Sequence, residues 1–172
     1  MQELIRLFAQ VALLRRGPQD LPASALLLGL TIAGYFAVNF LISSLLPPFQ
    51  GPWIAHLCVD VVFMFAWYTL LLRIVGKPER FLQTATAVYG FQLILSPLLI
   101  AAEGLTRRFP QDSLGQFAIS LLSLGMLIWI IAANSHIVKA ALEWSLLPSV
   151  ALVILQTLAG TLLMLELFPI PG

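Results

Sequence analysis

The chain has 172 residues, of which 60% are hydrophobic and only 10% are charged, and its mean hydropathy is +0.97. A soluble domain carries about 25% charged residues, so this composition excludes an ordinary soluble protein and favours an integral membrane protein surrounded by lipids. The net charge of +1 without a basic cluster argues against a nucleic-acid partner, and the single cysteine, Cys58, excludes an intramolecular disulfide.

Residues 1–16 have the spacing of an amphipathic helix. Its apolar face carries Leu4, Ile5, Phe8, Val11 and Ala12, and the polar residues fall largely opposite. This pattern predicts an N-terminal amphipathic helix that lies in the membrane interface, or equally a cytoplasmic segment that packs on the membrane domain. Gly17-Pro18 is expected to end it, since proline cannot continue a helix. We assign residues 1–20 to this helix and a linker.

Five apolar runs follow, each close to the roughly 20 residues that cross a bilayer. They cover residues 23–46, 54–72, 81–103, 114–138 and 145–168. The sequence therefore predicts an all-α, polytopic membrane protein in which residues 21–172 form one domain of five transmembrane helices. The connections between the runs are too short to hold a soluble catalytic domain.

The positive residues gather on one side of the predicted spans. Seven of the nine Lys and Arg residues precede the first span or join the second to the third and the fourth to the fifth: Arg6, Arg15, Arg16, Arg73, Lys77, Arg80 and Lys139. Arg107 and Arg108 fall on the opposite side. By the positive-inside rule, the N-terminus is cytoplasmic and the C-terminus is external.

Small residues recur every four positions along the first predicted span, at Ala25, Gly29, Ala33 and Ala37. In lipid, helices associate through close backbone packing, and a stripe of small residues permits it. This small-residue stripe predicts a helix–helix contact. Its partner is another span, a second copy of the chain or another membrane protein.

Three polar side chains are expected to meet in the external half of the first two spans: Asn39, His56 and Asp60. An aspartate at the centre of a span costs about 2.5–3.5 kcal/mol by insertion scales, so Asp60 must face protein or water. His56 and Asp60 are four residues apart and share a helix face, whereas Cys58 points roughly the opposite way. One helix cannot bring all three to a metal ion, so no metal or other cofactor is predicted.

The Asn39/His56/Asp60 cluster has three open roles. Its members can satisfy one another and fix how the helices meet, relay protons or ions, or bind a lipid headgroup or a partner.

Other polar residues fall within or just after the later spans. Gln92 is expected to bridge to a neighbouring helix, and Gln156 lies at a comparable depth. Asn134 is expected to anchor the cytoplasmic end of the fourth span. Lys139 and Glu143 have the spacing of a helical ion pair.

Residues 74–99 read IVGKPERFLQTATAVYGFQLILSPLL, a glycine-containing basic turn followed by a helix with a tyrosine and then a proline. This stretch resembles the Yip family, the Ypt/Rab-interacting membrane proteins. The matching residues are Gly76, Lys77, Phe81, Gln83, Tyr89 and Pro97. The resemblance implies five spans, a cytoplasmic N-terminus and an external C-terminus. The Asp-Leu-Tyr-Gly-Pro element of eukaryotic members is absent, so the chain looks like a compact bacterial member, and their small-GTPase contact is not carried over.

No G-x-S-x-G or H-E-x-x-H motif accompanies the polar residues. The sequence therefore favours a non-enzymatic membrane protein, a scaffold or assembly subunit that acts through helix–helix contacts with itself or another membrane protein. The alternative is a small transporter or lipid-handling protein that uses the Asn39/His56/Asp60 cluster.

Overall fold

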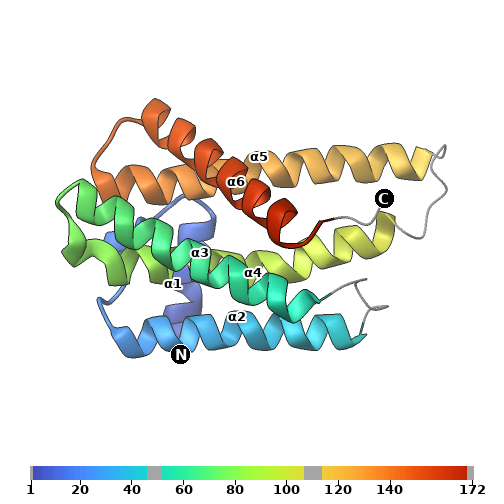
Figure 1. Cartoon of the computed structure of the whole chain (residues 1–172), viewed down its shortest axis with the longest axis horizontal. Helices are drawn as coiled ribbons and strands as arrows, with labels where there is room; N and C mark the ends of the chain where they lie inside the picture. The colour runs from blue at the N-terminus through green and yellow to red at the C-terminus, as the bar shows by residue number, and fades with distance from the viewer. Residues whose placement is uncertain (1, 46–51, 107–113, 170–172) are drawn as a thin grey trace.

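The structure is a computed structural model that describes residues 2–45, 52–106 and 114–169. These residues form helices and turns and contain no strand, which confirms the all-α prediction for this part of the chain. The elements are α1 (Gln2–Ala12), η1 (Pro18–Asp20), α2 (Ala25–Leu45), α3 (Trp53–Ile74), η2 (Pro78–Arg80), α4 (Phe81–Thr106), α5 (Leu114–Leu142) and α6 (Leu146–Leu167) (Figure 1). Leu46, Arg107 and Arg108 lie outside the described residues.

Four described segments are long and apolar enough to cross a membrane: Trp53–Ile74, Pro78–Leu99, Leu114–Leu142 and Leu146–Leu167. α2 adds a shorter apolar stretch, Ala25–Leu41. Large hydrophobic side chains stand exposed on the outer surfaces of these helices, as lipid contact requires. The long apolar helices therefore indicate a membrane protein.

The helices α2 to α6 run along the long axis of the molecule, while α1 runs across them (Figure 1). α4 is the central helix, since it packs against α1, α2, α3 and α5. Residues 84–91 of α4 are all buried, including the polar Thr84 and Thr86. Because successive long helices alternate in direction, the turn after α3 and the turn after α5 meet at one end of the bundle (Figure 1).

Helices α5 and α6 form a fork. They pack together next to their shared turn, and α6 then crosses obliquely to reach the first turns of α3 (Figure 1). The other arm of the fork, the beginning of α5, has few neighbours. In its fully described stretch from 114 to 132, only Ile119 is buried. The fork therefore leaves space between α5 and α6 in the half of the bundle away from their turn.

The N-terminal helix α1 packs on the bundle, which was one of the two placements left open by the sequence. It crosses α4 and α5, and its residues Val11 and Ala12 are buried there. The indole Nε1 of Trp129 donates a hydrogen bond of 2.9 Å to the carbonyl of Ala12. Gly90 makes the crossing close, because a Cβ at this position would overlap the Phe8 ring.

The end of α1 was predicted wrongly. The helix ends at Ala12, well before Gly17-Pro18, because Leu14 adopts the left-handed conformation with a φ of 60°. The N–H of Arg15 then closes onto the carbonyl of Gln10 at 2.8 Å, a backbone turn that terminates a helix without proline.

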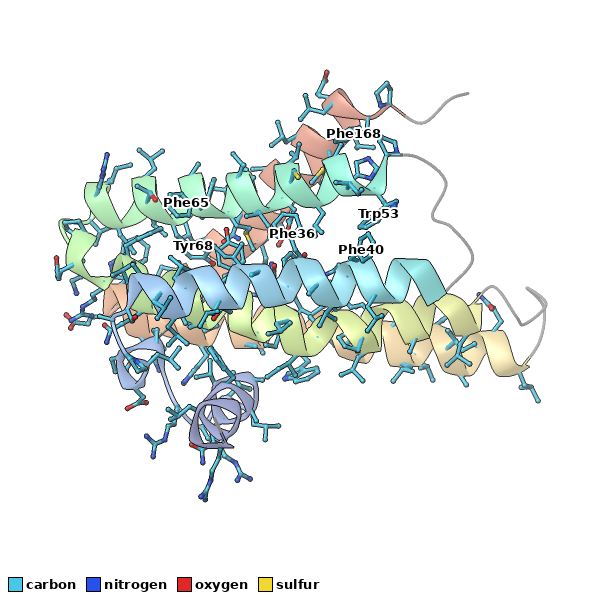
Figure 2. The ribbon with its side chains drawn as sticks, turned by 90° about the horizontal axis from the view of Figure 1, so that it is seen from below. Phe36, Phe40, Trp53, Phe65, Tyr68 and Phe168 are labelled. Atoms are coloured by element: carbon cyan, nitrogen blue, oxygen red, sulfur yellow. The ribbon has the colours of Figure 1, made fainter. Side chains whose placement is uncertain are left out.

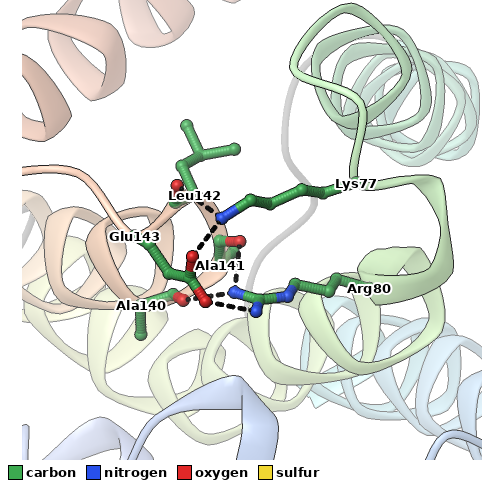
Figure 3. A network of polar contacts seen from close by, with 6 residues as sticks. All are labelled: Lys77, Arg80, Ala140, Ala141, Leu142 and Glu143. Atoms are coloured by element: carbon green, nitrogen blue, oxygen red, sulfur yellow. Dashed lines mark hydrogen bonds and ion pairs between the residues drawn. The ribbon is translucent and has the colours of Figure 1, made fainter.

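An ion-pair cluster ties the two basic turns together. Glu143, which follows α5, lies 2.5 Å from Nζ of Lys77 and also pairs with the guanidinium of Arg80 (Figure 3). Hydrogen bonds from Lys77 and then Arg80 lower the pKa of Glu143 from its ordinary 4.5 to about 2. Glu143 thus pairs with these two cations and not along a helix with Lys139, because the turn after α5 interrupts the helical spacing. α5 ends at Leu142, and Glu143 has a φ of 60°, so its side chain leaves the helix face of Lys139.

The same two cations cap α5. Lys77 donates to the carbonyl of Leu142 at 3.1 Å, and Arg80 donates to the carbonyls of Ala140 and Ala141 at 3.3 and 3.1 Å (Figure 3). These carbonyls have no partner within the helix. The two cations donate the missing hydrogen bonds and also interact favourably with the negative end of the helix dipole. The cluster thereby fixes the end of the bundle at which α5 and α6 are joined by their turn.

Candidate functional site

A cavity of about 480 Å³ lies in the fork, between α3, α4, α5 and α6. Its polar lining residues are His56, Asp60, Gln92, Asn134, Gln156, Thr157 and Thr161. Its apolar wall includes Phe63, Met64, Val153, Leu163, Met164 and Phe168. A volume between 300 and 1,000 Å³, a mostly apolar wall and a few convergent polar groups are typical of small-molecule sites.

The structure brings two of the three predicted cluster residues to this cavity. His56 and Asp60 both line it, as their shared helix face predicts. Asn39 lies outside it, because its side-chain amide donates to the Tyr35 carbonyl at 2.8 Å and to Ser96 Oγ at 3.2 Å. The hydroxyl of Tyr35 in turn donates to Asp60 at 3.2 Å. Tyr35 thus separates Asn39 from the two cavity residues.

His56 stands at one end of the cavity. Its ring meets the ring of Phe168 edge to face, with centroids 4.0 Å apart. Figure 2 shows Phe168 at the end of α6, beside the beginning of α3. Trp53 also faces Phe40 of α2, with ring centroids 6.0 Å apart (Figure 2). Aromatic contacts therefore join α2, α3 and α6 at this end of the bundle.

The residues of AHLCVD (55–60) do not make a metal site. Cys58 is exposed, on a different face of α3 from the cavity residues His56 and Asp60. In the described ranges, no three His, Cys, Asp or Glu side chains lie close enough to hold a metal ion.

A hydrogen-bonded amide forms the inner wall of the cavity. Gln156 of α6 is 6% exposed; its Oε1 accepts a hydrogen bond of 3.0 Å from the Tyr68 hydroxyl. Its Nε2 lies 2.7 Å from the sulfur of Met64. Both partners belong to α3, so Gln156 joins α6 to α3 across the bundle core.

Two further amides of the cavity are not fully partnered. Oε1 of Gln92 and Oδ1 of Asn134 are buried and have no hydrogen-bond partner among the described residues. Asn134 is only 7% exposed, and its Nδ2 donates to the carbonyl of Ile130 at 3.0 Å. A buried polar atom without a partner costs about 1–3 kcal/mol, so these acceptors require a reason. Both belong to residues that line the cavity, but the two oxygen atoms themselves are buried.

The sequence reasoning misplaced Asn134 and did not select the threonines. The fourth run was expected to end at 138, but α5 continues to Leu142, which moves Asn134 inward from the basic end. The sequence did contain a pattern that indicates which face of α6 lines the cavity. Gln156, Thr157, Gly160, Thr161 and Met164 recur at helical spacing and form a polar, small-residue face in an otherwise leucine-rich span.

The small-residue stripe of α2 does not face the core of the bundle. Ala25, Gly29, Ala33 and Ala37 are all exposed, while the buried face of α2 uses Leu28, Thr31 and Tyr35. A Cβ built on Gly29 would meet nothing within 4 Å among the described residues. Within the described bundle, the stripe therefore makes no contact of the kind that small residues permit.

The six family-like residues surround the start of α4. Gly76 has a φ of 73° in the turn after α3, a conformation that suits glycine, and Lys77 enters the ion-pair cluster. The Phe81 ring packs edge to face on Phe65, and the Gln83 amide donates to the Leu21 carbonyl at 2.8 Å.

The remaining two lie further along α4. The Tyr89 hydroxyl donates to the Val61 carbonyl at 2.6 Å, which ties α4 to α3. Pro97 is exposed, and α4 continues through it to Thr106.

Comparisons of the whole chain with models of protein families, with curated proteins and with solved structures give no match.

Proposed function

We propose that this protein binds small amphiphilic molecules within the membrane, as a transporter or lipid-handling protein. The observation that carries the proposal is the cavity of about 480 Å³ in the fork, which has a mostly apolar wall and a few polar side chains. The proposed activity is binding and movement of a ligand, with no chemical conversion.

In this proposal the protein crosses a bacterial inner membrane five times. α2 is the fifth span, since the whole helix has 21 residues, about the number that crosses a bilayer. The meeting of the Arg73–Arg80 turn and the turn after Lys139 at one end supports a cytoplasmic position for that end. The cavity then lies in the external half, with His56 and Phe168 at its outer limit.

In this arrangement α1 lies parallel to the membrane plane, inside the cytoplasmic leaflet. Gly90, where α1 crosses α4, is nine residues from Phe81, which corresponds to about 14 Å along the helix. Arg6, Arg15 and Arg16 are exposed and long enough to extend toward lipid headgroups.

The fork gives the cavity a lateral entrance. Thr161 and Leu165 of α6 line the cavity and are also exposed, and the opposite arm of α5 is largely unpacked. In a bilayer such an opening faces the acyl chains. A molecule with an apolar body can therefore enter from the membrane and place its polar head against the amides.

The test uses the protein in phosphatidylcholine nanodiscs and three fluorescent dansyl probes. The probes share a five-carbon tail that ends in an ammonium, a hydroxyl or a carboxylate group. We expect saturable binding of at least one probe. The substitution Thr161→Trp fills the cavity and should weaken that binding about tenfold or more, which is the loss of about 1.4 kcal/mol of binding energy.

The control is Leu162→Trp on the same helix. Leu162 is 63% exposed and does not line the cavity, so this variant should bind like the parent protein. Absence of saturable binding for all three probes, or unchanged binding in Thr161→Trp, would refute the proposal.

A second candidate function is scaffolding or assembly through the stripe Ala25/Gly29/Ala33/Ala37. Its support is that all four residues are exposed on one side of α2, where a second copy or another membrane protein could approach closely. We expect a dimer by native mass spectrometry in mild detergent. Gly29→Leu should convert it to a monomer.

Gly125→Leu provides the matched control for this test. A Cβ at Gly125, like one at Gly29, meets nothing within 4 Å among the described residues, but Gly125 lies on α5. The control should remain dimeric. A monomeric parent protein, or a Gly29→Leu variant that stays dimeric, would contradict scaffolding by self-association.

We also propose membership of the Yip family as a compact bacterial form. Its support is the set Gly76, Lys77, Phe81, Gln83, Tyr89 and Pro97, most of which make specific contacts around the central helix.

A further inference from the structure

The polar side chains of the cavity are partly engaged by the protein. Nε2 of Gln156 contacts Met64 and Nδ2 of Asn134 donates to Ile130, which uses one of the two N–H groups of each amide. The hydroxyls of the two threonines donate to backbone carbonyls one turn earlier, at 2.9 Å in both cases. The amides therefore keep donors as well as acceptors, and the choice of ligand depends on Asp60.

Oε1 of Gln92 and Oδ1 of Asn134 accept no hydrogen bond among the described residues, and both atoms are buried. The orientation of the Asn134 amide is fixed by its bond to Ile130, because a flipped amide would place two oxygens against each other. Asp60 adds a carboxylate that receives one described hydrogen bond, from Tyr35. A carboxylate has about four acceptor sites, so it can accept further donors.

The charge of the cavity points the same way. Asp60 is its one carboxylate, and the described lining contains no Lys or Arg. Phe63 and Phe168 add aromatic rings, whose faces attract cations. An anionic ligand would meet repulsion from Asp60 here, with no Lys or Arg in the described lining to offset it.

We infer that the cavity selects an organic cation with N–H donors, a protonated amine carried on an apolar body. The ammonium lies against Asp60, and the apolar body extends along α6 toward the membrane. This inference rests on the proposed function and specifies its ligand. The amine belongs either to a free amphiphile or to an ethanolamine-type lipid headgroup, because both present the same protonated primary amine.

The three dansyl probes test this selectivity. We expect the ammonium probe to bind at least about tenfold more tightly than the hydroxyl probe, and the carboxylate probe to bind most weakly. Equal or tighter binding of the hydroxyl or carboxylate probe would overturn the inference while leaving the binding function intact. Failure of all three probes would overturn the proposed function itself.

The Asp60→Asn substitution removes the charge of this side chain and leaves its size almost unchanged. It should weaken the ammonium probe about tenfold or more and change binding of the hydroxyl probe by less than about threefold. Asn134→Leu is the second variant, since it removes an unpartnered acceptor and otherwise only a bond within one helix. It should weaken the ammonium probe about three- to tenfold, and it provides the test if Asp60→Asn does not fold. Unchanged affinity in a folded variant would refute the inference.

Nanodiscs that contain phosphatidylethanolamine distinguish the two sources. If the lipid headgroup is the natural occupant, this lipid should compete with the ammonium probe and raise its apparent Kd relative to phosphatidylcholine alone. If the occupant is a free amine, the apparent Kd should be the same in both membranes. Either result supports recognition of an amine when the probe order holds.

Discussion

Replacing Gly90 with alanine is expected to lower the free energy of unfolding by about 1–3 kcal/mol, the usual cost of overpacking a buried site. The added methyl group would overlap the Phe8 ring, so α1 must move away from α4. The measurement is thermal or SDS-induced unfolding, combined with hydrogen exchange of the α1 amides. These amides should exchange faster in Gly90→Ala than in the parent protein.

Two further variants control for this prediction. The double variant Gly90→Ala/Phe8→Ala should be less destabilised than the sum of its two single changes, because the second truncation makes room for the first. Gly125→Ala should be neutral or slightly stabilising, since that glycine has open space around it and alanine favours a helix. A Gly90→Ala protein with parental stability and parental exchange in α1 would show that the crossing is not close.

Replacing Tyr68 with phenylalanine is expected to cost about 1–2 kcal/mol of unfolding free energy. Tyr68 is 2% exposed, and its hydroxyl is the donor to Oε1 of Gln156. Without it, this oxygen is left buried and unpaired beside the cavity. The measurement is reversible unfolding in mixed micelles, and binding of the ammonium probe serves as a second readout.

The pairing is isolated by a double-mutant cycle with Gln156→Leu. If the hydroxyl and the amide act as a pair, the Tyr68→Phe change should cost less in the Gln156→Leu background than in the parent protein. Additive costs would show that the hydroxyl stabilises the protein through some other contact.

The helices were predictable because lipid imposes a simple requirement on them. Each span needs a long apolar run, and α3 to α6 lie close to the runs read from the sequence. The end of α1 was not predictable in the same way. It depends on a left-handed residue, Leu14, whose type gives no hint of that conformation, while the Gly17-Pro18 signal suggested a later end.

The polar partners were harder to predict because depth alone does not choose them. Asn39 and Asp60 are at similar depth, yet α2 is rotated so that Tyr35 reaches Asp60 while Asn39 reaches Ser96 on α4. The order of the helices and their rotation are set by the packing of many side chains at once. The hydropathy of the sequence predicts neither. By contrast, His56 and Asp60 lie on one helix, so their common face followed from spacing alone.

The docking of α1 places a constraint on biosynthesis. The bond from Trp129 to Ala12 joins residues 117 positions apart, so α1 cannot complete its contacts until α5 has been made. At about 5–20 residues per second, the wait between the two residues is about 6–23 s. During that interval the apolar face of α1 needs another cover, which the lipid surface or a targeting factor can provide. α1 thus reaches its final position only after four later helices have been made.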